Sequence, residues 1–252
     1  MAGLTRQQDA FGWGIYDHFR GRPSQIIVER DDGYIEGLGL TGCFAESAAC
    51  AAYEKNALDL ACGRVLDVGA GAGRVALHLQ SHGLDVVGID NSPLAAKVCK
   101  ARGVKKVKVL PFNRISLKLG LFDTVVMYGN NFGLFGSFAR ARLLLRRLHV
   151  MTTPNARILG ATLDPYQTSD PKHLAYHRRN RACGRMGGQI RLRVRYKDYA
   201  TPWFDYLLVS KKELTGILKG TGWRLARCFD GRNGRYVAVI EKSEGVRATP
   251  GT

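Results

Sequence analysis

Short apolar runs alternate with helical patterns through most of the chain. From residue 64 onward the apolar runs predict strands over residues 64–69, 85–90, 106–110, 122–127 and 156–163. The segments between them have helical periodicity, most clearly over residues 74–81 and about 138–151. Regular alternation of this kind is typical of a parallel sheet with helices on both faces. We therefore predict an α/β fold.

The C-terminal part predicts the end of the same sheet. Ser210 and Glu213 form a capping box that begins a helix, which ends at Gly220 or Gly222. Two further strands are predicted, over residues 224–229 and 236–241, joined by a hairpin-type connection over residues 230–234. The predicted fold class is thus a Rossmann-like sheet of seven strands with helices on both faces, whose last strands form an antiparallel hairpin.

Two segments do not fit this alternation. Residues 1–62 combine an aromatic start, a glycine-rich middle and an alanine-rich end. Residues 164–203 are polar and rich in His, Arg and Tyr, and they predict a helix over 171–181 and a strand over 189–197. We predict that residues 1–62 form an N-terminal cap or lid, and that residues 63–252 form the core, with a substrate segment inserted at about 164–203.

Composition narrows the class of protein. With 252 residues, 45% of them hydrophobic, the chain is long enough for one α/β domain and a modest addition. It has no apolar run long enough for a membrane span, and charged residues near its start argue against a signal peptide. We therefore expect a soluble, cytoplasmic protein without a membrane partner. Its six cysteines form no Cys-x-x-Cys pair, so we interpret them as reduced packing residues: Cys43, Cys50, Cys62, Cys99, Cys183 and Cys228.

The net charge of +17 is distributed unevenly. It is −4 over residues 1–62, +9 over 63–170 and +12 over 171–252. Such a balance makes an anionic partner, RNA included, a candidate. The basic residues are nevertheless spread singly over the predicted helices and strands, so we interpret them mainly as a solvated surface.

The strongest candidate for chemistry is the turn Asp67-Val-Gly-Ala-Gly-Ala-Gly73 between a predicted strand and a helix. Glycines let the backbone approach a ligand closely, and the helix N-terminus offers free N–H groups. The spacing of Gly71, Gly73 and Ala76 also satisfies the dinucleotide fingerprint, with Asp90 nineteen residues after Gly71 as the ribose-binding acid. The glycines alone do not separate the two cofactor classes.

Asp67 favours a cationic cofactor, because a carboxylate two residues before the first glycine would repel a pyrophosphate. The chain also leaves no room for a separate substrate domain of the dehydrogenase kind. The run Leu66-Asp-Val-Gly-Ala-Gly-Ala-Gly73, with Gly88-Ile-Asp90-Asn-Ser downstream, resembles motifs I and II of the class I S-adenosylmethionine-dependent methyltransferases.

This resemblance implies S-adenosylmethionine as the cofactor. It implies that Asp90 accepts the ribose hydroxyls and that Asn91 lies beside the adenine. The acid that the family often has after the third strand is replaced by Leu110-Pro-Phe-Asn113, and Asn113 is the nearest substitute. The expected cofactor-binding residues are Asp67, Gly69, Ala70, Gly71, Gly73, Arg74, Asp90, Asn91, Asn113, Tyr128 and Asn130.

The loop after the fourth strand bears on the acceptor. Its sequence, Tyr128-Gly-Asn-Asn-Phe-Gly-Leu-Phe135, is similar to the Gly-Asn-Ser-Phe loop of small-molecule methyltransferases and unlike the Asn-Pro-Pro-Tyr loop of enzymes that methylate nucleobase amines. We expect a methyltransferase that acts on an oxygen, nitrogen or carbon of a small, aromatic or anionic acceptor. An RNA methyltransferase is the alternative. A nicotinamide-dependent oxidoreductase and a non-catalytic cofactor-binding partner protein are weaker readings.

Candidate acceptor residues come from the inserted segment and the aromatic start. We predict His173, Tyr176 and His177 as catalytic candidates, since a base helps when the acceptor must lose a proton. The two histidines are spaced like metal ligands, but no third ligand accompanies them, so we expect no metal. The expected substrate-binding residues are Trp13, Tyr16, Asn131 and Tyr166. The oligomeric state is left open.

Overall fold

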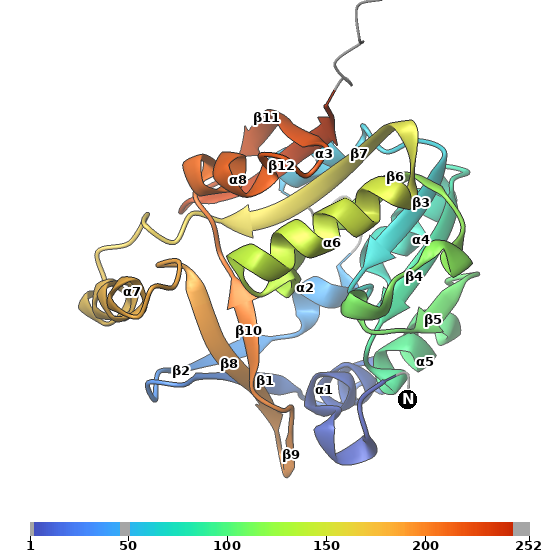
Figure 1. Ribbon diagram of the computed structural model, residues 1–252. Helices are drawn as coiled ribbons and strands as arrows, with labels where there is room; N and C mark the ends of the chain where they lie inside the picture. The colour runs from blue at the N-terminus through green and yellow to red at the C-terminus, as the bar shows by residue number, and fades with distance from the viewer. Residues whose placement is uncertain (1–2, 46–50, 244–252) are drawn as a thin grey trace, which may run out of the picture.

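The computed structural model describes residues 3–45 and 51–243. Two sheets form its frame, and the smaller lies below the larger in Figure 1. Over the two described ranges, no helix combines the length and the apolar character that crossing a membrane requires.

The larger sheet has seven strands in the order β11-β12-β7-β6-β3-β4-β5. Neighbours from β5 to β7 run parallel, while β12 runs antiparallel to both β7 and β11. This arrangement confirms the predicted α/β fold with a C-terminal antiparallel hairpin. The strands are β3 (Arg64–Val68), β4 (Asp85–Asp90), β5 (Val107–Val109), β6 (Phe122–Met127), β7 (Thr152–Leu163), β11 (Trp223–Asp230) and β12 (Arg235–Lys242).

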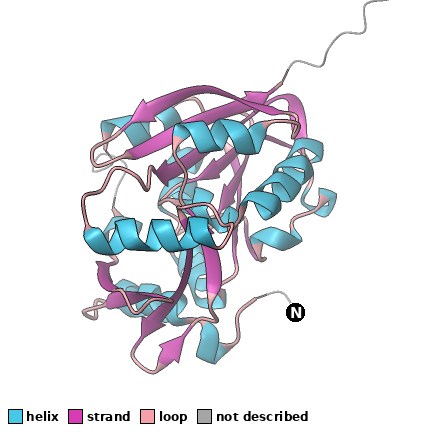
Figure 2. Cartoon of the chain, turned by 60° about the vertical axis from the view of Figure 1, so that its left-hand side comes forward, coloured by secondary structure: helices cyan, strands magenta, loops and turns pink. Residues whose placement is uncertain are grey.

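Helices cover both faces of this sheet, as Figure 2 shows. Successive strand residues point to opposite faces, so Leu66 packs in the cluster that holds α6 and α8, whereas Val65 packs in the cluster that holds α3 and α4. Burial on both faces is why the central strands are continuously apolar. These helices are α3 (Ala52–Leu58), α4 (Arg74–Ser81), α6 (Phe138–Val150) and α8 (Lys211–Leu218).

Side-chain caps begin two of the helices, and the second of them was predicted from the sequence. The Ser92 hydroxyl accepts a hydrogen bond from the Ala95 N–H at 2.9 Å and begins α5 (Pro93–Ala101). The Ser210 and Glu213 capping box begins α8.

The smaller sheet combines two segments that are far apart in the sequence. Its order is β10-β8-β1-β2, with β9 paired to β8, and all its pairs are antiparallel. Of its strands, the sequence pattern predicts only β8, because every residue of β2 is exposed and so carries no apolar alternation. The strands are β1 (Gln25–Arg30), β2 (Ile35–Gly39), β8 (Gln189–Tyr196), β9 (Tyr199–Ala200) and β10 (Phe204–Leu207).

The smaller sheet and its helices contact helices that flank the larger sheet. Helix α1 packs against α5, and β10 packs against η5, the short helix that follows β6. The helix predicted over 171–181 is confirmed as α7 and lies at the outer end of the smaller sheet in Figure 1. The remaining elements are α1 (Ala10–Phe19), α2 (Thr41–Phe44), α7 (Pro171–Ala182), η1 (Arg6–Gln8), η3 (Phe112–Arg114), η4 (Leu117–Leu119) and η5 (Asn131–Phe135).

Candidate active site

The glycine turn between β3 and α4 requires glycine for two different reasons. Gly69, Gly71 and Gly73 all have positive φ, of 72°, 56° and 84°, which side chains disfavour. A Cβ atom at Gly69 would also lie 2.4 Å from the Asn131 amide nitrogen, and one at Gly73 would lie 2.7 Å from Val104. At Gly71 no atom would come closer than 3.9 Å, so the turn is open at this point.

Asp90 holds this turn from the end of β4. One of its carboxylate oxygens accepts a hydrogen bond from the Gly71 N–H and the other from the Ser92 N–H, each at 2.9 Å. Burial raises the pKa of this carboxyl, and the two N–H donors oppose that rise. Because a carboxylate offers about four acceptor positions, further donors such as ribose hydroxyls can still bind Asp90.

Asp67 is a buried carboxyl with an unused acceptor. Its Oδ2 atom has no hydrogen-bond partner among the residues that the structure describes. Burial, with a contribution from the nearby charge of Asp90, raises the pKa of Asp67 to about 7. An orphaned buried carboxylate beside an open glycine turn suits the cationic amino-acid end of S-adenosylmethionine, so the residues present fit that cofactor.

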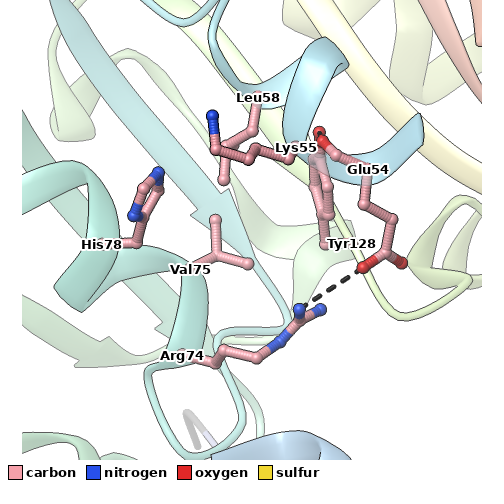
Figure 3. A pocket seen from close by; sticks show the side chains of 7 residues that line it. All are labelled: Glu54, Lys55, Leu58, Arg74, Val75, His78 and Tyr128. Carbon is pink, nitrogen blue, oxygen red and sulfur yellow. Dashed lines mark hydrogen bonds and ion pairs between the residues drawn. The ribbon is translucent and has the colours of Figure 1, made fainter. Parts of the chain in front are cut away.

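Arg74 and Tyr128 meet helix α3 on the side of the turn shown in Figure 3. The Arg74 guanidinium pairs with Glu54 at 3.4 Å, and the Tyr128 hydroxyl donates to the Glu54 carbonyl at 2.9 Å. Both residues line a pocket of about 10 Å³, the size of one water molecule. Their predicted contact with the cofactor stays a prediction.

Helix α1 brings an apolar face to the turn that the sequence analysis missed. Phe11 and Ile15 provide the side chains nearest to a Cβ atom placed at Gly71, at 4.0 and 3.9 Å. Asp9 fixes this position, because its carboxylate accepts from the Gly12 N–H of its own helix and from the Leu94 N–H of α5. The signal in the sequence was an acidic N-cap followed by apolar residues with i, i+4 spacing.

Trp13 and Tyr16, the aromatic residues predicted to contact the substrate, lie on another face of α1. The Trp13 ring stacks on Tyr199 with centroids 5.0 Å apart, and its indole N–H donates to the Arg6 carbonyl. The Tyr16 ring meets Trp13 edge to face, with Lys97 over it. These contacts place both rings between α1, β9 and α5, so their role at a substrate stays a prediction.

The loop after β6 is tied to the glycine turn. The Asn131 side-chain amide donates to the carbonyls of Val68 and Gly69, at 3.0 and 2.9 Å. Asn130 has a left-handed backbone, and its carbonyl accepts a hydrogen bond of 2.5 Å from the Tyr206 hydroxyl of β10. The amide hydrogens of Asn131 are thus bound to the turn, and its predicted contact with the substrate stays a prediction.

Three further cofactor candidates lie at the ends of β3, β4 and β5. The Ala70 N–H donates to the Ile89 carbonyl at 3.1 Å, and the Asn91 carbonyl accepts from the Leu4 N–H at 2.9 Å. Asn113 is exposed, and its carbonyl accepts from the Arg147 guanidinium at 2.7 Å. Their side chains therefore remain candidates for contact with the adenosine.

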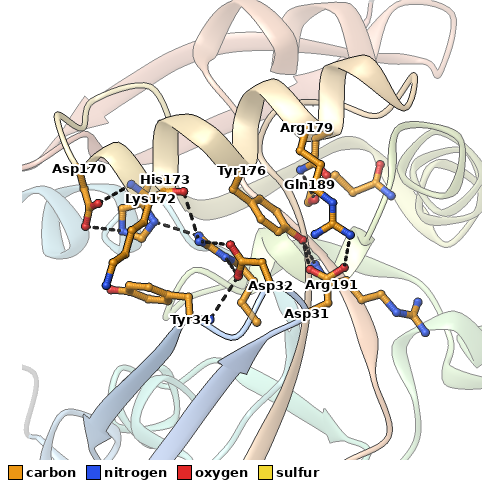
Figure 4. Close-up of polar contacts among 12 residues, drawn as sticks. Asp31, Asp32, Tyr34, Asp170, Lys172, His173, Tyr176, Arg179, Gln189 and Arg191 are labelled. Atoms are coloured by element: carbon orange, nitrogen blue, oxygen red, sulfur yellow. Dashed lines mark hydrogen bonds and ion pairs between the residues drawn. The ribbon is translucent and has the colours of Figure 1, made fainter.

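Helix α7 carries two of the predicted catalytic residues, His173 and Tyr176, into a polar cluster with the turn after β1 (Figure 4). Arg30 is the centre of this cluster: it is only 7% exposed and pairs with Asp32 at 2.8 Å. Its guanidinium lies over the rings of Tyr34 and Tyr176. It also donates to Nδ1 of His173 at 2.9 Å, and since arginine has only donors, this nitrogen must be the unprotonated one.

Tyr176 and His177 have different neighbours. The Tyr176 hydroxyl donates to Asp31 at 2.5 Å, and burial together with Asp31 raises its pKa to about 12. The His177 ring lies edge to face with Tyr166, and its buried Nδ1 has no partner in the described part of the chain. Burial, then the charge of Arg181, lowers the pKa of His177.

Tyr166 donates to Glu213 of α8 at 2.5 Å, away from the cluster around Arg30. No hydrogen bond within residues 3–45 and 51–243 joins Tyr166 or the three α7 residues to the glycine turn. Their roles as catalytic and substrate-binding residues stay predictions.

The comparisons with known proteins agree with this geometry. The family described as methyltransferase domain matches residues 65–155. The crystal structure of a SAM-dependent methyltransferase from Bacteroides fragilis, in complex with S-adenosyl-L-homocysteine, is 27% identical, with a TM-score of 0.82 over 96% of this chain and 98% of that chain. No protein of curated function matches the sequence.

Other solved structures share the fold at lower identity. The CcbJ methyltransferase from Streptomyces caelestis is 15% identical, with a TM-score of 0.62 over 94% of this chain and 99% of that chain. DesVI from Streptomyces venezuelae is 16% identical, with a TM-score of 0.55 over 76% of this chain and 91% of that chain.

The chain is therefore an S-adenosylmethionine-dependent methyltransferase that resembles the class I family over residues 65–155, and S-adenosylmethionine is its cofactor. When bound, this cofactor supplies a methyl group already activated by a sulfonium. What remains for the protein is to bind it, align the acceptor and exclude water.

Proposed function

We propose that the acceptor is a small aromatic or anionic molecule, methylated on oxygen, nitrogen or carbon by in-line displacement. The observation that carries this proposal is the attachment of the smaller sheet at two flanks of the glycine turn. On one flank Asp9 fastens α1 to α5, and on the other the Tyr206 hydroxyl fastens β10 to the loop after β6. Because the smaller sheet and α1 are attached on both flanks of the glycine turn, they favour an acceptor of limited size over a long polymer.

In this proposal the core residues bind the cofactor and the added segments bind the acceptor. Asp90 would accept the ribose hydroxyls, and Asp67 would accept the ammonium group. Phe11 and Ile15 would pack over the cofactor at Gly71 and exclude water from it. Residues 1–62 would then act as the cap, and residues 164–203 as the substrate segment.

The distribution of the basic residues supports a small acceptor over RNA. Arg193 and Arg195 of β8 both pair with Glu29 of β1, at 2.9 and 3.3 Å. Arg191 of the same strand pairs with Asp205 of β10 at 3.6 Å. These pairs join the strands of the smaller sheet and offset part of its positive charge, which leaves less of that charge available to phosphates.

A labelling experiment tests the proposal. The protein would be incubated with S-adenosylmethionine carrying a labelled methyl group and with a cell extract separated by dialysis into small molecules and macromolecules. We expect label in a dialysable compound that chromatography separates from S-adenosylmethionine, with Asp90→Ala as the inactive control. Label found only in the RNA of the retained fraction would establish the alternative acceptor instead.

A further inference from the structure

A groove of about 420 Å³ lies between the N-terminus of α6 and the loop that joins α7 to β8. Phe138 and Ala139 line it from the helix, Arg185 and Met186 from the loop, and Gln189 from the start of β8. The catalytic site as described above uses none of these residues. A volume of this size is in the range of small-ligand sites.

Gln189 is the feature of this groove that points to a ligand. The residue is only 9% exposed, and its carbonyl accepts from the Asn180 amide at 2.7 Å. Its own side-chain amide makes no hydrogen bond to any other residue in the described ranges. Its amide atoms are not among the fully buried side-chain atoms that lack a partner, so within the described residues they stay accessible from the groove that Gln189 lines, and a ligand group can pair with them there.

The helix end and the arginines around the groove favour an anion. Helix α6 has thirteen residues, and its first turn offers N–H groups and the positive end of its dipole, with only the Arg140 N–H capped by Ser137. The Arg140 guanidinium lies near this end, 3.6 Å from a Cβ atom placed at Gly136. Arg185 in the lining and Arg140 on the first turn of α6 therefore bring positive charge close to the groove.

One carboxylate also lies at this mouth. Asp205 pairs with Arg185 at 3.3 Å and with Arg191 at 3.6 Å, so it offsets only part of the charge of the two arginines. An arginine has five N–H donors, and most of those of Arg185 remain for a ligand.

Strand β10 connects this groove to the cofactor side of the molecule. Asp205 accepts a hydrogen bond from Arg185, which lines the groove, while the next residue, Tyr206, donates to the Asn130 carbonyl in the loop after β6. Phe138, which is 43% exposed, and Met186 add apolar wall. A ligand with a charged end and an apolar body would match both kinds of wall.

We propose that this groove binds the anionic group of the methyl acceptor, a carboxylate or a phosphate attached to an apolar body. This inference rests on the proposed small-molecule acceptor and names its charge class. The Gln189 amide, the Arg185 guanidinium and the first N–H groups of α6 bind the anion, and Phe138 and Met186 contact the body.

Calorimetric titration of the full chain with phenyl phosphate and with benzoate, at low ionic strength, tests this site without requiring turnover. We expect Gln189→Leu and Arg185→Gln each to raise the Kd of the tighter probe about tenfold, because each removes a hydrogen bond to a charged group. The near-isosteric Gln189→Glu should abolish binding through repulsion. The matched control is Arg224→Gln, which removes an arginine that likewise pairs with one carboxylate, Glu241, on the distant strand β11.

The site would be overturned if the parent protein, Gln189→Leu and Arg185→Gln had equal Kd values for the probe. It would also be overturned if Arg224→Gln lost as much affinity as Arg185→Gln, because binding would then depend only on overall charge. Displacement of the probe by a short oligoribonucleotide whose own binding depends on Gln189 would overturn the small-molecule assignment. Failure of both probes to bind would refute the anion site and leave the labelling test of the proposed function intact.

Discussion

Asp67 and Asp90 end the adjacent parallel strands β3 and β4, and both carboxyls are buried. Their environments differ in one respect. Asp90 accepts two backbone N–H groups, whereas Asp67 keeps an acceptor atom without a partner and has a pKa of about 7. In the proposed function these environments suit different tasks: Asp90 would accept neutral hydroxyls and Asp67 would face a positive charge.

The raised pKa of Asp67 predicts that cofactor binding depends on pH. The ammonium of S-adenosylhomocysteine gains most from the ionised carboxylate, which becomes scarce as the pH falls through about 7. We expect its affinity to fall below this pH with a slope approaching tenfold per unit. Calorimetry over a pH series checks this, with Asp67→Asn as the control that should show a flat profile.

The folding stability of the free protein depends on pH in the opposite direction to cofactor affinity. A carboxyl whose pKa is higher in the folded than in the unfolded state contributes stability at low pH, and that contribution is lost as the pH rises through about 7. Asp67→Asn should therefore be more stable than the parent protein above neutral pH. A parent affinity that does not change with pH would show that Asp67 does not bind the ammonium group.

At the scale of elements, α1 presents two aromatic faces with different surroundings. Phe11 and Ile15 face the glycine turn, while Trp13 stacks on Tyr199 of the smaller sheet. The helix is held in this orientation by the buried carboxylate of Asp9, which bonds to α1 and α5 at once. Helix α1 therefore connects the glycine turn to the smaller sheet.

A pair of substitutions on α1 separates these faces. Phe11→Ala removes apolar surface next to Gly71 and should weaken S-adenosylhomocysteine binding roughly fivefold to tenfold, about the effect of exposing half a buried ring. Trp13→Ala should leave this affinity unchanged, although it removes the larger ring. If Phe11→Ala and Trp13→Ala both bind S-adenosylhomocysteine as tightly as the parent protein does, α1 does not contact the cofactor.

The two histidines of helix α7 serve either structure or catalysis, and two alanine substitutions separate these roles. His173→Ala leaves a buried N–H of Arg30 without its acceptor, so it should lower the free energy of unfolding by about 1 to 3 kcal/mol in urea denaturation. If one histidine is the base, its alanine variant should also lose turnover while S-adenosylhomocysteine affinity stays the same. Full activity in both His173→Ala and His177→Ala would exclude both residues as bases.

At the scale of the whole molecule, the net charge of +17 remains the most prominent compositional feature. Ion pairs such as those of Glu29 join the strands of the smaller sheet and lower the pKa of that carboxyl through Arg193. The other basic groups are distributed over several surfaces. This distribution suits non-specific attraction to phosphates without reading of bases.

We therefore expect any binding to RNA to be weak and to disappear with salt. The affinity for a mixed-sequence oligoribonucleotide should fall by orders of magnitude as salt approaches roughly 0.2 M, because the binding comes from counterion release. Fluorescence anisotropy at increasing salt measures this. Tight, sequence-dependent binding that persists at that salt concentration would favour the RNA alternative.

The larger sheet and the glycine turn were predicted from the sequence because their signals are local. Apolar runs form buried strands, and the positive φ of Gly69, Gly71 and Gly73 is a property of single residues. The positions of Asp67 and Asp90 follow from the parallel strands that they end, since carboxyl ends of such strands meet at one edge. The resemblance to methyltransferases depended on these same residues.

Only the tertiary structure decided which side chains surround that turn. Phe11 and Trp13 are both aromatic residues of α1, and nothing in their spacing shows that the first faces Gly71 and the second Tyr199. The Asn131 amide, which follows β6, donates to the Val68 carbonyl at the end of β3. Strand β1 pairs with β8, although most of the chain separates them in sequence. Such contacts join residues distant in sequence, so their energies depend on the assembled fold and leave no periodic pattern in the chain.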